Sequence, residues 1–177
     1  MKRIILLVFA VVLVGCDGNS EFLSAVAKGE NELAKGYVAN GQDVNQTNRY
    51  GWTALMYAAR SGDVAMIEYL ASKGASLDAT DHAGWTAMTR AAKEGHAAAV
   101  ERLLDLGANK ELATDTGWTP LLWATLQGHT EVVRLLVKRG ANLQAKTEDG
   151  RVPLVIAITE EHNEILQILQ DAGAKAW

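Results

Sequence analysis

The sequence contains few of the residues that cross-links and metal centres require. Its 177 residues include one Cys and 4 His, so an internal disulfide, a cysteine-rich zinc site and an iron–sulfur cluster are excluded. Basic residues are not in excess either, because 17 Lys and Arg stand against 21 Asp and Glu and the formal net charge is −4. We therefore do not expect the basic surface that a nucleic acid partner needs.

Residues 1–15 have the pattern of an export signal. Lys2 and Arg3 form a positively charged start, and residues 4–14 are an uninterrupted apolar run. This run is too short for a membrane-spanning helix, which needs about 20 residues, and it matches the apolar region of a signal peptide. We expect residues 1–15 to be absent from the mature protein.

The residues that close this run indicate the kind of signal. Leu13, Val14, Gly15 and Cys16 resemble the lipobox of bacterial lipoproteins, in which the cysteine is acylated and becomes the new N-terminus. The alternative is an ordinary signal peptide that happens to contain a cysteine. The resemblance implies a lipid anchor at Cys16, and Asp17 resembles the signal that keeps enteric-type lipoproteins in the inner membrane.

Glycine, by contrast, is abundant and regularly spaced. Fourteen of the 16 glycines fall on three positions of a 33-residue period, which is the mark of a repeat architecture. These glycines are Gly18, Gly51, Gly84, Gly117 and Gly150; Gly29, Gly62, Gly95 and Gly128; and Gly41, Gly74, Gly107, Gly140 and Gly173.

The residues between these glycines repeat as well. Residues 51–55, 84–88 and 117–121 align without a gap, and each segment begins with Gly-Trp-Thr. This pattern resembles the ankyrin repeat over about five units, which cover the whole of the mature chain. The resemblance implies an all-α solenoid of helix-turn-helix units joined by β-hairpin-like turns. The expected units are residues 16–47, 48–80, 81–113, 114–146 and 147–177.

Each unit carries local signals for the ends of its first helix. A threonine is placed to cap this helix and a glycine to end it in the left-handed conformation. These residues are Thr53, Thr86 and Thr119, and Gly62, Gly95 and Gly128. In the fifth unit Val152 and Glu161 replace them, as expected for a modified terminal unit. The histidine that follows the threonine in the usual ankyrin pattern is absent, so we expect a hydrogen bond of the family to be missing.

Catalytic and metal-binding motifs are absent from the sequence. His96, His129 and His162 are themselves in repeat register, and equivalent positions of stacked units lie about 10 Å apart, too far for shared ligation of a metal. We expect these histidines to be structural. No nucleophile elbow, His-Glu-x-x-His motif or phosphate-binding loop occurs, and the carboxylates are scattered. The sequence therefore predicts a protein that is not an enzyme and binds neither a metal nor a cofactor.

The resemblance implies a concave groove, lined by the turn tips and the exposed side of the first helices, that binds a protein. Trp52, Trp85 and Trp118 form a row in this groove, and either packing or contact with a partner would explain them. Basic residues gather in its first half and acidic residues in the last unit, which would steer a partner of opposite polarity. The predicted contact residues are Arg49, Tyr50, Trp52, Tyr57, Arg60, His82, Trp85, Arg90, Lys93, Asp115, Trp118, Trp123, Leu126, Glu148, Asp149 and Arg151.

Together these features predict a lipoprotein on the periplasmic face of a bacterial membrane that binds one protein partner and is monomeric when free. Two roles are open: an immunity protein that blocks a membrane-acting effector, such as a secreted phospholipase, or a scaffold for a resident envelope enzyme, for example in peroxide defence. The short tether after Cys16 favours the first role. A hydrolytic enzyme is the alternative from a different class.

Overall fold

The structure is a computed structural model that describes residues 20–176, so the predicted signal segment, Cys16 and Asp17 lie outside the described residues. The described chain forms ten short helices, which confirms the all-α prediction. They are α1 (Glu21–Lys28), α2 (Asn31–Ala39), α3 (Ala54–Ser61), α4 (Val64–Ser72), α5 (Ala87–Lys93), α6 (Ala97–Asp105), α7 (Pro120–Leu126), α8 (Thr130–Lys138), α9 (Pro153–Thr159) and α10 (Asn163–Asp171).

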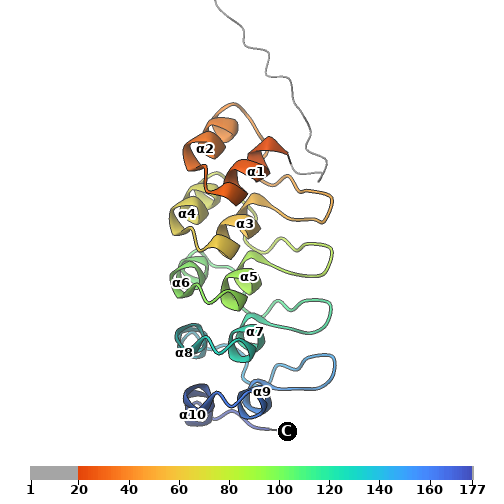
Figure 1. The fold of residues 1–177 in the computed structure, drawn as a ribbon, viewed down its shortest axis with the longest axis vertical. Coiled ribbons are helices and arrows are strands. Elements are labelled where there is room, and N and C mark those ends of the chain that lie inside the picture. Colours follow the sequence, from red (N-terminus) through yellow and green to blue (C-terminus); the bar gives the residue numbers. More distant parts are fainter. Residues whose placement is uncertain (1–19, 177) are drawn as a thin grey trace, which may run out of the picture.

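The helices are stacked as antiparallel pairs in two columns. Figure 1 shows the odd-numbered helices in one column, next to a row of projecting loops, and the even-numbered helices in the other. Each odd-numbered helix packs against the next odd-numbered helix, and α4, α6, α8 and α10 pack in the same serial way. The core between the columns combines small alanines of the first helices with branched side chains of the second helices, such as Ile67, Val100 and Leu136.

The predicted helix signals occupy the predicted places. The hydroxyl groups of Thr53, Thr86 and Thr119 accept hydrogen bonds from the backbone N–H three residues later, at 3.3, 3.1 and 3.4 Å. Ser20 caps α1 in the same way, at 3.2 Å from the N–H of Leu23. In the fifth unit Val152 provides no side-chain cap, and α9 begins instead with Pro153, whose missing N–H needs no partner there.

The ends of the first helices also follow the prediction. Gly62, Gly95 and Gly128 have φ angles of 72°, 80° and 73°, in the region that favours glycine. Glu161 stands at the equivalent place of the fifth unit with φ 57°, and among residues 20–176 it is the one non-glycine residue with positive φ. The backbone geometry of the repeat is thus kept even where the glycine is lost.

The expected loss of a hydrogen bond at the missing family histidine is partly offset. In the second unit the N–H of Thr53 lies 3.5 Å from Sδ of Met56, which stands at the histidine position. In the third unit the hydroxyl groups of Thr86 and Thr89 are 2.9 Å apart. In the second and third units, a methionine or threonine side chain therefore makes a contact at the start of the first helix in place of the family histidine.

The loops that project from the first helices are connected to one another. We call residues 48–52, 81–85, 114–118 and 147–151 the tips; each is closed by a backbone hydrogen bond between its first and last residue, at 3.0 to 3.1 Å. Successive tips are joined by further backbone bonds, for example from the N–H of His82 to the carbonyl of Tyr50 at 3.1 Å. Because this link recurs between all four tips, the row of loops in Figure 1 is a hydrogen-bonded array.

The three histidines in repeat register have the structural role that was expected, and the structure shows that they join neighbouring units. Nε2 of His96 lies 3.0 Å from the carbonyl oxygen of Arg60, and Nε2 of His129 lies 2.8 Å from that of Lys93. His162 makes the same contact with Leu126 at 3.2 Å. Each imidazole thus satisfies a carbonyl at the end of the preceding first helix.

Within residues 20–176 no helix combines the length and the apolar character needed to cross a membrane.

Candidate functional site

Three positions of the second, third and fourth units, with Arg151 of the fifth, form a surface beside the tips, which we call the contact strip. The position at the end of each tip holds aromatic residues in three units, and the other two positions lie on the first helices. The strip consists of Trp52, Trp85, Trp118 and Arg151; of Tyr57, Arg90 and Trp123; and of Arg60, Lys93 and Leu126.

Aromatic rings of the strip contact one another within and between units. The ring centroids of Trp52 and Tyr57 are 4.9 Å apart. Trp123 lies 4.9 Å from Trp85 and 4.7 Å from Trp118, so its ring bridges the third and fourth units. These tilted contacts lie in the range of favourable aromatic pairs. The tryptophan row therefore packs, while each ring remains only half-buried.

Cations of the strip lie over these rings. The guanidinium carbon of Arg90 is 3.3 Å from the ring centroid of Trp52 and 5.0 Å from that of Trp85. Arg60 lies 5.6 Å from the Trp52 centroid, and Nζ of Lys93 lies 5.7 Å from that of Trp85. All of these distances allow cation–π attraction, which aligns the charged side chains along the strip.

Arg90 was expected as an exposed groove cation, but its side chain is only 12% exposed because Trp52 of the preceding unit covers it. It forms an ion pair with Asp81, whose side chain is 4% exposed. Burial lowers the pKa of the Arg90 guanidinium, and the neighbouring Asp81 carboxylate counteracts this shift. The other oxygen of Asp81 accepts hydrogen bonds from the N–H groups of Ala83 and Trp85, at 2.9 and 3.0 Å.

Asp81 and its equivalents hold the tips in shape, and the sequence analysis did not predict this role. In the second unit Asn48 takes the place of Asp81, and its amide donates to the hydroxyl of Tyr57 at 3.0 Å. The first residue of a tip and the residue nine positions later therefore form a pair. In the fourth unit Thr114 and Trp123 stand at these two positions without such a pair, and the indole Nε1 of Trp123 is buried with no hydrogen-bond partner among the described residues.

Two hollows open between neighbouring tips. The first, which we call the tryptophan slot, measures about 320 Å³ and lies between the second and third units. Its lining residues are Tyr50, Trp52, Asp81, His82, Ala83, Trp85 and Arg90. Five of these were predicted contact residues, and the structure brings them together around one opening.

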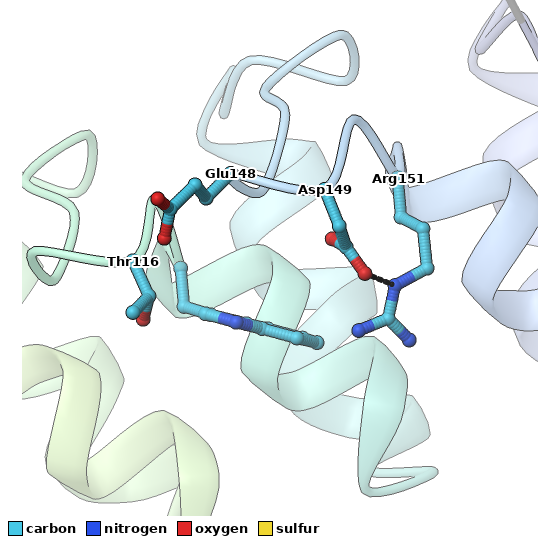
Figure 2. A pocket seen from close by; sticks show the side chains of 5 residues that line it. Thr116, Glu148, Asp149 and Arg151 are labelled. Atoms are coloured by element: carbon cyan, nitrogen blue, oxygen red, sulfur yellow. Dashed lines mark hydrogen bonds and ion pairs between the residues drawn. The ribbon is translucent and has the colours of Figure 1, made fainter.

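The second, which we call the acidic hollow, measures about 260 Å³ and lies between the fourth and fifth units. It is lined by Thr116, Trp118, Glu148, Asp149 and Arg151 (Figure 2). Arg151 lies 5.1 Å from the ring centroid of Trp118 and donates to the Asp149 carboxylate at 2.8 Å. A hydrogen bond from Thr147, with the charge of Arg151 adding to it, lowers the pKa of Asp149. This end of the strip therefore carries two carboxylates, of which Asp149 is paired with Arg151.

A third hollow, of about 300 Å³, lies on the helices α6 and α8, away from the tips. Sequence reasoning gave no sign of it. It is lined by two cations, Arg134 and Lys138, and Arg134 is paired with Glu131 and Glu164, at 3.8 and 2.9 Å. The remaining predicted contact residues lie on the tip side: Arg49 is over the ring of Tyr50 at 4.8 Å, and the N–H of Asp115 bonds to the preceding tip.

Groups of three or more His, Cys, Asp or Glu side chains that could hold a metal ion do not occur within residues 20–176. What the strip offers is a row of aromatic faces with charged groups along it. Such a surface can bind, because aromatic and arginine side chains supply much of the energy at protein interfaces.

Comparison with known proteins agrees with this architecture. The sequence model of the family described as "Ankyrin repeats (3 copies)" matches residues 22–114 and 107–177. Over 54 residues the chain is 37% identical to the ankyrin repeat, SAM and basic leucine zipper domain-containing protein 1 of Oryctolagus cuniculus. That segment is 30% of this chain and 11% of the rabbit protein, so the chain spans a small part of that relative. Since the family match extends over most of the chain, the protein belongs to the ankyrin-repeat family.

Proposed function

We propose that this protein is a non-enzymatic lipoprotein that binds one partner protein along the contact strip and acts as an immunity protein. Its partner would be an effector that attacks the membrane, such as a secreted phospholipase entering the periplasm. Ankyrin repeats are a protein-interaction domain. The immunity role is the cellular purpose that we assign to this interaction.

The observation that carries the proposal is the continuity of the strip over three units. Trp52, Trp85 and Trp118 are held in register by bonded tips, and each ring keeps an exposed part. A preorganised aromatic surface costs little ordering entropy on binding, which suits a protein that must bind an incoming effector tightly.

The position of the strip relative to the lipobox supports a partner at the membrane. α1 begins at Glu21, a few residues after Cys16, so a lipid on that cysteine would hold the stack close to the bilayer. Five stacked units extend about 50 Å, which keeps the strip within reach of the membrane surface. An effector that acts on membrane lipids would therefore be close to the strip while it is at the membrane surface.

The proposal is tested by deleting the gene and exposing the cells to a periplasmic phospholipase effector. We expect lysis, rescue by the wild-type gene, and no rescue by Trp85→Ala with Trp118→Ala. Cys16→Ser should rescue less than wild type because the anchor is lost. Lys138→Ala, on α8, is the matched control and should rescue fully.

Full resistance of the deleted strain would contradict the immunity role. Recovery of a resident envelope enzyme as the bound partner would favour the scaffold role instead. Circular dichroism of the double tryptophan variant must show retained helix content; if helicity is lost, the tryptophan row has a structural role.

A further inference from the structure

The tryptophan slot is surrounded by cations that each lie on one of its rings. Arg49 lies over Tyr50, Arg60 over Trp52 and Lys93 over Trp85. Arg90 lies at the base between the two tryptophans. An apolar opening is thus encircled by positive charge contributed from two units.

Few carboxylates balance these cations. Asp81 is the acid that lines the slot, and its two oxygens are used by Arg90 and by the backbone of its own tip. Among residues 20–176 no carboxylate lies within 4.0 Å of Arg49 or Arg60, and Lys93 has only Glu94 at 3.9 Å. Around the slot, Arg49 and Arg60 are therefore exposed guanidinium groups without an acidic partner among residues 20–176, and the ammonium group of Lys93 has only a long contact with Glu94.

We propose that the tryptophan slot binds an acidic segment of the partner protein, with one aromatic or large apolar side chain in the slot and flanking carboxylates on Arg60 and Lys93. This inference rests on the proposed protein binding along the strip and names the chemistry of the bound segment. Carboxylates suit the site because arginine binds them with two parallel hydrogen bonds. The tryptophan faces displace water and strengthen these contacts.

The far end of the strip favours a peptide over a uniformly anionic surface. The acidic hollow places Glu148 and Asp149 beside Trp118, and Arg151 is paired with Asp149, so one negative charge is left over. This excess negative charge disfavours an anionic membrane that would lie along the whole strip. A protein segment can be acidic at one end alone. Charge on the strip thus fixes both the place and the direction in which the segment lies.

The test uses the mature protein and synthetic peptides with blocked ends. The probe has a central phenylalanine flanked by glutamates; one control peptide has glutamines in place of the glutamates, and a second has alanine in place of the phenylalanine. Tryptophan fluorescence and calorimetry at low salt measure the affinity. We expect the acidic phenylalanine peptide to bind at least about tenfold more tightly than either control.

Variants locate the binding. Arg60→Gln with Lys93→Gln should weaken binding of the acidic peptide about tenfold, and Lys138→Gln on α8 should leave it unchanged. The substitutions at Arg60 and Lys93 change only the side chains, so the backbone carbonyls that His96 and His129 contact are kept. Helix content and unfolding midpoint are measured to show that the variants fold.

Equal binding of the glutamate and glutamine peptides would overturn the proposal, as would an unchanged affinity in the Arg60 and Lys93 variant. Binding to phosphatidylglycerol vesicles that is lost in the same variant, without peptide binding, would assign these cations to the membrane. If an effector is bound and neutralised while the acidic peptide is not, the acidic segment is wrong and the immunity role stands.

Discussion

At the scale of single residues, the first position of each tip determines what its unit can place on the contact strip. Asn48, Asp81, Thr114 and Thr147 each accept a hydrogen bond from the N–H four residues later, at 3.0 to 3.2 Å. In Asn48 and Asp81 the second polar atom of the side chain then pairs with the side chain nine residues later. An amide pairs with the phenol of Tyr57, and a carboxylate pairs with a guanidinium.

This pairing predicts a rescue. Arg90→Leu leaves the buried Asp81 carboxylate without its cation, and we expect a loss of about 3 kcal/mol in the free energy of unfolding. Replacing the pair by the one in the second unit, Asp81→Asn with Arg90→Tyr, should recover most of that loss. Urea unfolding followed by circular dichroism measures both variants.

The control is Asp81→Asn alone, which keeps the two backbone hydrogen bonds of the tip and should cost less than Arg90→Leu. If the double variant is no more stable than Arg90→Leu, the stacking of Arg90 on Trp52, rather than the ion pair, holds the tip.

Glu161 is a second residue whose conformation has a measurable cost. Its φ of 57° lies in the left-handed region, where the equivalent residues of other units are glycines. We expect Glu161→Gly to stabilise the protein by about 1 kcal/mol, measured by urea unfolding. Glu160→Gly is the matched control; because Glu160 has φ −91°, this change should destabilise or have no effect. Equal effects of the two changes would argue against backbone strain.

At the scale of secondary-structure elements, the ends of α3, α5 and α7 are each coupled to the next unit through a glycine and a histidine. A Cβ on Gly95 would lie 2.6 Å from Nδ1 of His129, whereas one on Gly74 would meet nothing within 4 Å. Glycine therefore permits two things at position 95, a left-handed backbone and the approach of an imidazole.

The two requirements can be separated. Gly74→Ala and Gly95→Ala both place alanine at positive φ, 87° and 80°. This should lower the free energy of unfolding of each variant by about 1–2 kcal/mol. Gly95→Ala must also displace His129 from the carbonyl of Lys93, which adds about 1 kcal/mol. Chemical denaturation of both variants gives the difference. Equal losses would show that the histidine contact contributes nothing to stability.

Sequence patterns predicted these elements well because caps and helix ends depend on local chemistry. Thr53 and Gly62 act within their own unit, and the 33-residue spacing places their equivalents. Contacts between units were harder to foresee. The burial of Arg90 depends on Trp52 of the preceding unit, and the tryptophan slot exists because two tips lie side by side. Neither the burial of Arg90 nor the slot can be predicted from the residues of a single repeat, because each depends on contact between two units.

At the scale of the whole molecule, each unit is stabilised by its contacts with the neighbouring units. Backbone bonds join the tips, and histidines at the start of second helices contact the first helix of the preceding unit. Ion pairs join the second helices, such as Arg102 with Glu68 at 2.9 Å. The exposed ion pairs each contribute little, so packing of the helices carries most of the coupling. Middle units share such contacts with two neighbours.

The fifth unit differs, since α9 and α10 pack against α7 and α8 on one side, and α10 carries exposed polar residues on its outer face. Amide hydrogen exchange should therefore be faster in α9 and α10 than in α5 to α8, because local opening there breaks one interface and not two. Mass spectrometry of peptic fragments measures this difference. Glu161→Gly should slow exchange in α9 and α10 by the same free energy that it adds to global stability. Uniform exchange across α5 to α10 would instead mean that the stack opens as one cooperative unit, and the strain at Glu161 would then be felt equally by every helix.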